Sequence, residues 1–250
     1  MTHDPVTQRA PRKAVIMARG LGTRMRKAAV GVSLTAEQAS AAQAGVKAMI
    51  SLDGRPFLDY VISSLADAGF DQFCLVIGPE HDLIRNYYDS CEKSRVEITY
   101  AIQEQPLGTA DAVAAAEDFA GDDRVLVVNS DNFYPEDAVA RLREVPASAT
   151  LGFTKRAMID QSNIDPERIR AFALLDSDDS GQLADIIEKP APEVVDAAGE
   201  TALVSMNCFL LTPRIFEACR SIEKSARGEY EIVDAVRWMV EQGERFAVVP

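Results

Sequence analysis

The first half of the chain alternates short apolar runs with stretches of helical periodicity, and this alternation limits the fold more than any other feature. Three runs have the length and composition of buried strands: KAVIM at 13–17, FCLVIG at 73–78 and RVLVVNSD at 124–131. Helical patterns follow them at 55–68, 82–90 and 109–119. Strands joined through helices need crossover connections, which give a mainly parallel sheet covered on both faces. The sequence therefore predicts an α/β fold.

The second half is patterned differently. Residues 171–190 indicate two strands joined by the polar turn DSDDSG, which is typical of a hairpin. The remaining expected elements are a strand at 203–213, a helix from Pro213 through Cys219, an amphipathic helix at 229–243 and a final strand at 246–250. No internal repeat or linker interrupts the pattern, so we expect a single domain spanning residues 1–250.

The charge balance limits the partners. The chain has 39 Asp and Glu against 26 Lys and Arg, a net charge of −13, so nucleic acid and membranes are not expected partners. No apolar run reaches the ~18 residues of a membrane-spanning helix, and the N-terminal segment lacks a signal-peptide core. The 4 cysteines show no CxxC pair or zinc spacing, which predicts reduced thiols and a cytoplasmic protein. With 2 histidines, a multi-histidine metal site is not expected.

The first strand leads directly into the glycine-rich loop ARGLGTRMR at 18–26. Such loops, at the carboxyl ends of parallel strands, bind ligands in open α/β sheets. Neither GxGxxG nor GxxxxGK[ST] is present, because Met25 stands where the first motif needs its third glycine. The glycines of G-L-G-T-R allow backbone N–H groups to approach phosphates, and Arg24 adds a rigid fork of donors. Taken alone, the stretch fits a tight turn with a surface arginine equally well.

Further segments extend the pattern: GVKAMISLDGRPFLDYV, IQEQPLGTADAV at 102–113, VVNSDNFYP at 127–135, IIEKP at 186–190 and GEYEIVDAV at 228–236. In this order, over Lys13 to about Val249, they resemble the sugar-phosphate nucleotidyltransferases, particularly the glucose-1-phosphate thymidylyl- and uridylyltransferase type. The resemblance implies a single-domain nucleotide-diphospho-sugar transferase (Rossmann-like) fold, with a mixed, mainly parallel central sheet flanked by helices. About 13–135 would then bind the nucleotide and about 136–250 the sugar phosphate.

The implied reaction joins a nucleoside triphosphate to a sugar 1-phosphate and releases pyrophosphate. The attacking phosphate is already ionised at neutral pH, because its second pKa is about 6, so no general base is needed. In-line positioning and charge neutralisation carry such chemistry. The resemblance implies Mg²⁺ as cofactor, which binds through one or two carboxylates together with phosphate oxygens. Its implied ligands are Asp131, at the end of the third apolar run, and Asp234.

The resemblance also implies roles for other side chains. Beside Asp131, the catalytic residues would be Arg24 on the β- and γ-phosphates, Lys47 on the triphosphate side and Lys189 on the sugar phosphate. Gln103, whose amide can pair with a donor and an acceptor, and Gly108 in the base slot favour UTP or dTTP. The nucleotide site would be completed by Ala18, Gly20, Gly22, Thr23 and Thr109. The sugar-phosphate site would contain Ala171, Glu188, Lys189, Ser205 and Asn207.

Several departures from the family pattern leave alternatives open. Arg19 stands where the family usually has a small residue, and the Ala-rich stretch 27–45 is expected to be a mobile insertion. Ala171 and Asn207 replace glycines of the relatives that use glucose 1-phosphate, which favours a modified hexose, a heptose or a cyclitol phosphate. One alternative is a guanylyl- or cytidylyltransferase acting on a cyclitol or heptose phosphate. Another, motivated by Arg19 and the early end at Pro250, is a non-catalytic nucleotide-binding regulator. The sequence leaves homo-oligomerisation open.

Overall fold

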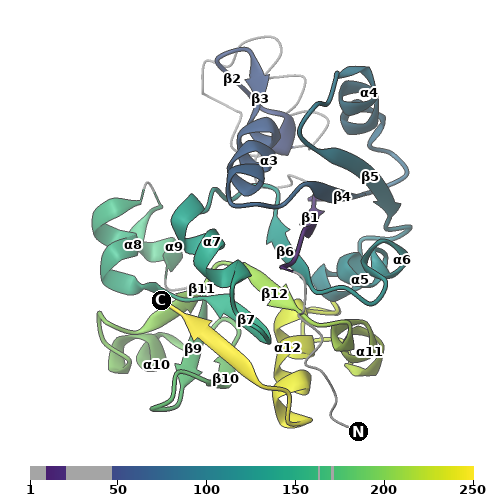
Figure 1. Ribbon diagram of the computed structural model, residues 1–250. Helices are drawn as coiled ribbons and strands as arrows, with labels where there is room; N and C mark the ends of the chain where they lie inside the picture. The colour runs from purple at the N-terminus through teal and green to yellow at the C-terminus, as the bar shows by residue number, and fades with distance from the viewer. Residues whose placement is uncertain (1–9, 21–46, 163, 170–171) are drawn as a thin grey trace, which may run out of the picture.

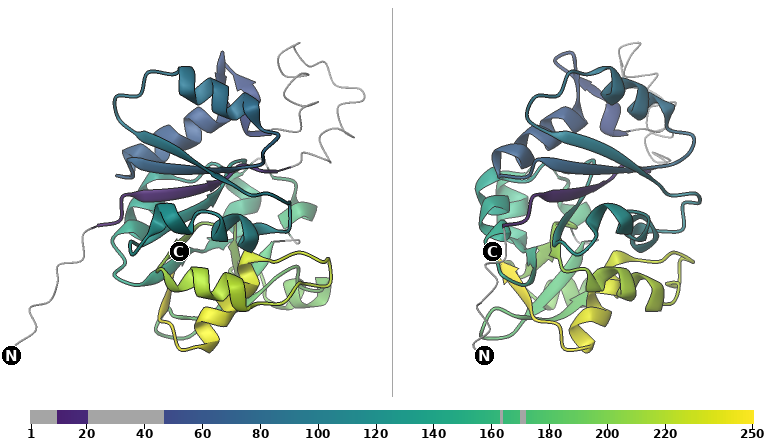
Figure 2. Two further views of the ribbon diagram at one scale, coloured as in Figure 1. Left: turned by 90° about the vertical axis from the view of Figure 1, so that its right-hand side faces the viewer. Right: turned by 45° about the vertical axis from the view of Figure 1, so that its right-hand side comes forward.

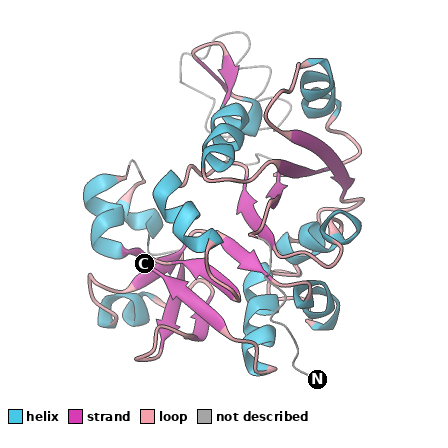
Figure 3. Ribbon diagram, viewed as in Figure 1, coloured by secondary structure: helices cyan, strands magenta, loops and turns pink. Residues whose placement is uncertain are grey.

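Two larger β-sheets and a two-stranded one, with helices packed around them, make up the described part of the computed structural model, residues 10–20, 47–162, 164–169 and 172–250 (Figure 1, Figure 3). The larger described sheet has the strand order β13-β7-β12-β6-β1-β4-β5. Its strands are β1 (Lys13–Met17), β4 (Gln72–Ile77), β5 (Glu97–Ile102), β6 (Val125–Asn129), β7 (Ser148–Leu151), β12 (Phe209–Leu211) and β13 (Phe246–Val249). Among these strands β12 runs antiparallel to its two neighbours, and the other neighbouring pairs are parallel. The mixed, mainly parallel central sheet is therefore confirmed.

Helices cover both faces of this sheet (Figure 2). One face carries α3 (Phe57–Asp67), α4 (Asp82–Ser90) and α7 (Glu136–Arg143), and the other carries α5 (Thr109–Ala114), α6 (Glu117–Ala120), α11 (Arg214–Ser221) and α12 (Ile232–Glu241). Successive side chains of a strand point to opposite faces. In β1, Ala14 and Ile16 accordingly pack on the first face, whereas Val15 and Met17 pack on the second. This double burial explains why β1 is apolar throughout.

A smaller antiparallel sheet contains β8 (Phe153–Thr154), β9 (Ala173–Ser177), β10 (Leu183–Ile187) and β11 (Leu203–Ser205). Strands β9 and β10 form the predicted hairpin. In its turn the Asp178 carboxylate accepts hydrogen bonds from the backbone N–H groups of Ser180 and Gln182. Three short helices each bury one apolar side chain against this sheet: Met158 of α8 (Lys155–Gln161), Ile169 of α9 (Pro166–Ile169) and Val195 of α10 (Pro192–Ala197).

The boundaries of four predicted helices differ from the structure. The helix predicted from Pro213 through Cys219 runs from Arg214 to Ser221, and the helix predicted at 229–243 runs from Ile232 to Glu241. A 3-10 turn, η1 (Lys47–Met49), leads into a short hairpin of β2 (Ser51–Leu52) and β3 (Arg55–Pro56). The helix expected at 55–68 therefore begins only at Phe57, because Arg55 and Pro56 pair with β2. The helix expected at 109–119 is divided into α5 and α6. Helix α4 has the predicted bounds.

The strand predicted at 203–213 is two strands that belong to different sheets. Strand β11 pairs with β8 and β9 in the smaller sheet, whereas β12 pairs with β6 and β7 in the larger one. The chain crosses between them at Asn207, whose φ of 57° lies in the left-handed region and interrupts an extended strand. The sequence pattern hides this crossing because the apolar residues on both sides of it are buried.

Other elements carry no clear sequence signal. Among the elements that the sequence pattern does not predict are β5, β7, α7, α8 and α10. In β5, for example, the alternate residues are only partly buried, so EITYAI lacks the strong apolar character of β4. Within the described ranges, none of the helices combines the length and the apolar content that crossing a membrane requires.

Tyr134 ties the β11–β12 crossing to the loop after β6. Its buried hydroxyl donates to the Met206 carbonyl at 2.7 Å and accepts from the Asn132 amide at 3.1 Å. Tyr134→Phe removes this donor and keeps the ring, so we expect urea denaturation to show a loss of about 1 kcal/mol in the free energy of unfolding. Tyr60→Phe is the control, because its more exposed hydroxyl donates to the Leu52 carbonyl at 3.0 Å. Equal losses in both variants would contradict a special role for the buried hydroxyl.

Candidate active site

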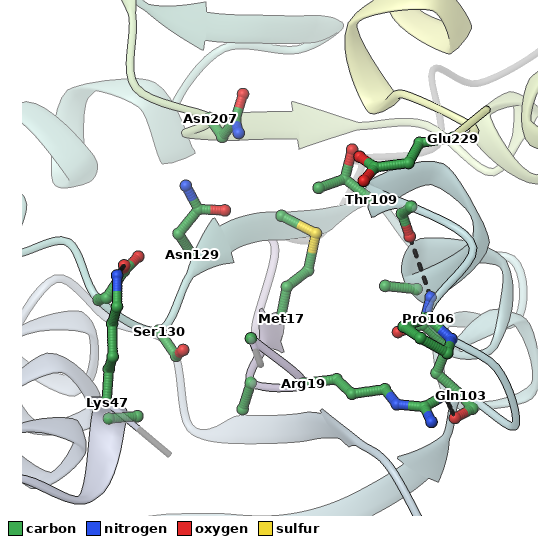
Figure 4. Close-up of a pocket in the computed structure, with 16 residues that line it drawn as sticks. Met17, Arg19, Lys47, Gln103, Pro106, Thr109, Asn129, Ser130, Asn207 and Glu229 are labelled. Atoms are coloured by element: carbon green, nitrogen blue, oxygen red, sulfur yellow. Dashed lines mark hydrogen bonds and ion pairs between the residues drawn. The ribbon is translucent and has the colours of Figure 1, made fainter. Parts of the chain in front are cut away.

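The carboxyl ends of β1 and β6 open into a cavity of about 580 Å³ (Figure 4). Segments far apart in the sequence line it: Met17–Gly20 after β1, Lys47 and Ala48 of η1, Asn129–Asp131 after β6, and the loop and helix start around Gln103, Pro106, Gly108, Thr109 and Ala112. Asn207 and Glu229 complete the lining. The cavity lies at the edge of the sheet where open α/β folds bind ligands.

Many of the residues predicted from the sequence line this cavity: Ala18, Gly20, Lys47, Gln103, Gly108, Thr109, Asp131 and Asn207. Four others lie outside its lining: Glu188, Lys189, Ser205 and Asp234. Gly22, Thr23, Arg24, Ala171 and the segment 27–45 fall outside the described residues. The structure thus gathers most of the predicted nucleotide residues that it describes, and their individual roles stay predictions.

Lys47 and Asp131 bring opposite charges together across the cavity, although they are 84 residues apart. Lys47 Nζ lies 3.5 Å from Asp131 Oδ2, and the two side chains are 36% and 46% exposed. An ion pair this accessible to solvent contributes little to the stability of the fold, so the fold does not depend on either charge. Asp131 can therefore exchange its lysine for another cation, and Lys47 can turn to an anion.

The donor set fits Mg²⁺ as an ion that shares its coordination sphere with a substrate. Asp131 offers hard carboxylate oxygens at the cavity, and magnesium usually takes one or two carboxylates with water and phosphate oxygens. Asp234, in the first turn of α12, accepts a hydrogen bond from Arg237 Nη1 at 3.1 Å, and burial raises its pKa. Within the described ranges, no three His, Cys, Asp or Glu residues cluster closely enough to hold a metal ion by themselves.

The buried side chain of Gln103 is held in one orientation. Its Nε2 donates to the Gly108 carbonyl at 3.0 Å and to Asp111 Oδ2 at 2.7 Å. Both partners are acceptors, which fixes the amide nitrogen on their side and leaves Oε1 as the free acceptor end of the amide. The sequence suggested that this amide would offer both a donor and an acceptor. In the structure its two N–H groups are already used, so it offers an acceptor.

Gly108 is required by the packing of the chain. It has a φ of 126°, and a Cβ added to it would lie 2.4 Å from the Tyr230 carbonyl oxygen. Close by, the Tyr230 N–H donates to the Leu107 carbonyl at 2.8 Å, and Thr109 Oγ1 accepts from the Ile232 N–H at 2.8 Å. These contacts join the predicted nucleotide loop to the start of α12. The sequence argument placed Gly108 in a base slot; the structure adds a steric reason for glycine here.

Near the predicted sugar-phosphate residues, Arg227 lies close to three glutamate side chains. It forms an ion pair with the buried Glu231, and its Nη2 lies 3.7 Å from Glu229 and 4.0 Å from Glu188. Burial, together with the charge of Glu231, raises the pKa of the Glu188 carboxyl. The adjacent Lys189 has a φ of 45°, an uncommon left-handed conformation for lysine. The surroundings of Glu188 therefore disfavour its ionised form.

Several residues that line the cavity are not predicted from the sequence. Asn129 and Ser130 line it next to Asp131, and Glu229 lines it beside Thr109 (Figure 4). A signal for the first two was present, because the polar run N-S-D directly follows the buried residues of β6. Glu229 lies in the segment GEYEIVDAV, in which the sequence pointed only to Asp234 as a site residue.

Comparison with known proteins places the chain in a family. Residues 13–249 match the family described as Nucleotidyl transferase, and the chain belongs to this family. The protein is therefore a nucleotidyltransferase, as the sequence predicted.

The relatives and solved structures agree with this assignment. The chain is 30% identical, over 92% of its length and 84% of the relative, to the UTP–glucose-1-phosphate uridylyltransferase AglF of Haloferax volcanii. It is 30% identical to a glucose-1-phosphate thymidylyltransferase of Streptomyces griseus, covering 92% of this chain and only 58% of that relative. A UDP-glucose pyrophosphorylase structure complexed with UDP-glucose superposes with a TM-score of 0.73 at 18% identity, covering 95% of this chain and 89% of the other. The predicted fold is thereby confirmed.

Glu188→Gln should stabilise the protein. A raised pKa means that folding disfavours the ionised carboxylate, so wild type loses stability as the pH rises above the ordinary range of glutamate. We expect the variant to melt a few degrees above wild type at pH 7.5. The difference should shrink toward pH 4.5, because the wild-type carboxyl becomes protonated and neutral like the amide.

Thermal unfolding across this pH range measures the effect. Glu193→Gln, at an exposed position of α10, is the matched control and should melt like wild type at each pH. A melting temperature for Glu188→Gln that is lower than wild type, or a difference that is constant with pH, would contradict the prediction.

Proposed function

We propose that this protein transfers a nucleotidyl group from UTP or dTTP to a sugar 1-phosphate or a sugar-like phosphate, releasing pyrophosphate. The observation that carries the proposal is the cavity in which Lys47, Asp131 and Gln103 meet. The names of its relatives, a uridylyl- and a thymidylyltransferase, support the same reaction. Residues 13–135 would form the nucleotide half and residues 136–250 the sugar-phosphate half.

The chemistry follows from charge and position. The acceptor phosphate is already an anionic nucleophile, so the protein needs to align it with the α-phosphorus and to neutralise the charge that spreads in the transition state. Lys47 lines the cavity, and its ammonium group is proposed to neutralise charge on the triphosphate. Arg24 is proposed to hold the β- and γ-phosphates, and Lys189 the acceptor phosphate. No covalent intermediate with the protein is required.

Magnesium is proposed as the cofactor. Asp131, with Asp234 as the second ligand, would hold the ion, which supplies charge neutralisation on the triphosphate. The paired state of Asp131 in the structure supports this assignment, because Lys47 already occupies the position of a cation beside the carboxylate. The hydrogen bond from Arg237 to Asp234 positions that carboxylate at the start of α12.

Asn207 supports a proposal about the acceptor. It lines the cavity in a left-handed conformation, which asparagine tolerates better than most residues other than glycine. In Figure 4 the amide of Asn129 points toward Asn207, so two amides lie on this side of the cavity. Relatives that use glucose 1-phosphate are expected to have glycine at 207. The added amide favours a differently substituted ring: a modified hexose, a heptose or a cyclitol phosphate.

A substrate matrix tests the proposed function. UTP, dTTP, CTP and GTP are each combined with glucose 1-phosphate, a heptose 1-phosphate, a modified hexose 1-phosphate and a cyclitol phosphate, and pyrophosphate release is measured with magnesium. We expect the highest kcat/KM with UTP or dTTP, and an acceptor other than glucose 1-phosphate.

Each other outcome overturns a stated part of the proposal. Glucose 1-phosphate as the best acceptor by about tenfold, or 1.4 kcal/mol, would refute the acceptor prediction. A higher kcat/KM with GTP would favour the guanylyltransferase alternative. Nucleotide binding with no pyrophosphate in any combination would favour a non-catalytic regulator.

Asp131→Asn tests the metal assignment. The amide keeps the shape of the side chain and removes its charge, so we expect turnover to fall by roughly 10²–10³. The melting temperature should barely change, because the carboxylate is 46% exposed and its ion pair is accessible to solvent. Asp137→Asn, on the exposed face of α7, is the control and should keep wild-type turnover. Near wild-type turnover of Asp131→Asn at saturating magnesium would show that the assignment is wrong.

A further inference from the structure

Arg19 is a buried cation at one end of the cavity. It follows β1, its side chain is only 7% exposed, and it extends along the cavity toward Gln103 (Figure 4). Its Nη1 donates to the backbone carbonyl of Gln103, and its Nε and Nη2 lie 3.4 Å from the carboxylate of Glu80. The guanidinium is therefore fixed at two sides, and a second N–H on Nη1 remains for another acceptor.

The loop after β4 leaves space for the Glu80 side chain beside Arg19. A Cβ on Gly78 would lie 2.3 Å from Glu80 Oε2, so the missing side chain lets the carboxylate fold back over the loop. The Gly78 N–H donates to Nδ1 of the buried His81 at 3.3 Å, which leaves Nε2 as the protonated nitrogen, 3.9 Å from Glu80 Oε1.

At neutral pH the two titratable groups of this loop, Glu80 and His81, have defined protonation states. Burial lowers the pKa of His81, so its ring is neutral. The backbone amide of Glu80 and the charge of Arg19 hold the pKa of Glu80 below its usual range. Glu80 is therefore an anion that positions the Arg19 guanidinium.

Arg19 and Gln103 together present a defined pattern to a ligand. The guanidinium only donates, and Gln103 Oε1 only accepts, because its amide N–H groups are bound to Gly108 and Asp111. Arg19 Nη1 donates to the backbone carbonyl of Gln103, and both residues line the cavity, so both can contact the same ligand. A ring that pairs with both must carry a donor next to an acceptor, as a ring N–H beside a carbonyl does.

Uracil and thymine carry this edge, with N3–H between two carbonyls. Cytosine has the same size, but its N3 is a lone pair that would face Gln103 Oε1. Because the ribose and triphosphate fix where the ring lies, cytosine cannot slide to bring its amine there instead. Buried polar groups left unpaired, or facing a like partner, discriminate strongly between such analogues.

We propose that Arg19, positioned by Glu80, is a specificity-determining residue that selects nucleoside triphosphates whose base presents a ring N–H beside a carbonyl. This rests on the proposed function and deepens it, since it assigns the choice of uracil or thymine over cytosine to named residues. Glu80 acts through Arg19 and is a positioning residue.

The test compares two pairs of triphosphates that differ in this edge, UTP with CTP and GTP with ATP. Calorimetric Kd values are measured without acceptor, and kcat/KM values with the best acceptor. Arg19→Met keeps the length of the side chain and removes its donors, and Glu80→Gln weakens its support. Arg95→Met is the matched control, because Arg95 is an exposed arginine paired with Asp67 at 2.5 Å.

Wild type and Arg95→Met should bind UTP at least about tenfold more tightly than CTP. In Arg19→Met this ratio should fall to within about threefold, and Glu80→Gln should lie between. Melting curves show whether Arg19→Met is folded. If it is not, the UTP/CTP ratio of Glu80→Gln decides the test. Equal binding of UTP and CTP by wild type, or an unchanged ratio in the folded Arg19→Met protein, would overturn the proposal.

The remaining outcomes separate this inference from the proposed function. A UTP/CTP ratio that depends on Arg19, without transfer to any acceptor, would uphold the inference and overturn the proposed reaction. Transfer to an acceptor with no preference among the bases would overturn the inference about Arg19 and uphold the proposed transfer reaction. A preference for GTP over ATP and over UTP that depends on Arg19 would uphold selection of a ring N–H beside a carbonyl and overturn the choice of a pyrimidine.

Discussion

The parallel register of β1, β4 and β6 brings separate segments of the chain to one level at the carboxyl edge of the sheet. Met17 is opposite Val76 on one side and Asn129 on the other. The hydrogen bonds continue past the strand ends, from the Ala18 N–H to the Val76 carbonyl at 2.9 Å and from the Ser130 N–H to the Met17 carbonyl at 3.3 Å. The loops that carry Arg19, Glu80 and Asp131 therefore begin side by side. A change of register in this sheet would separate all of them.

A second set of contacts joins the two halves of the protein. Gly108 approaches the backbone of Tyr230 closely, and the Thr109 hydroxyl accepts from the first N–H of α12. The loop that holds Gln103 is thus bonded to the segment that leads to Asp234. The proposed nucleotide side and the proposed acceptor side of the cavity are consequently joined by backbone contacts into one packed unit.

The sequence predicted the features that depend on local pattern. The buried strands β1, β4 and β6 were visible because both of their faces are apolar, and the position of Asp131 followed from the end of β6. The family resemblance brought in Lys47, which no local pattern connects with a carboxylate 84 residues away. The crossing at Asn207 was not predicted, because a left-handed residue between two buried strands leaves the apolar pattern unbroken. The support of Arg19 by Glu80 was equally hidden, since it depends on the space left by Gly78.

The conformation of Asn207 has a consequence for how the cavity can diversify. Its φ of 57° admits glycine, asparagine and aspartate readily and penalises β-branched or bulky side chains. The backbone conformation therefore restricts position 207 to a few residue types, independently of which ligand binds in the cavity. Asn129 and Ser130 lie at the end of an ordinary strand, where no such restriction applies. Across related proteins, changes in ligand shape should be absorbed mainly at the end of β6, while position 207 varies between a few small or polar residues.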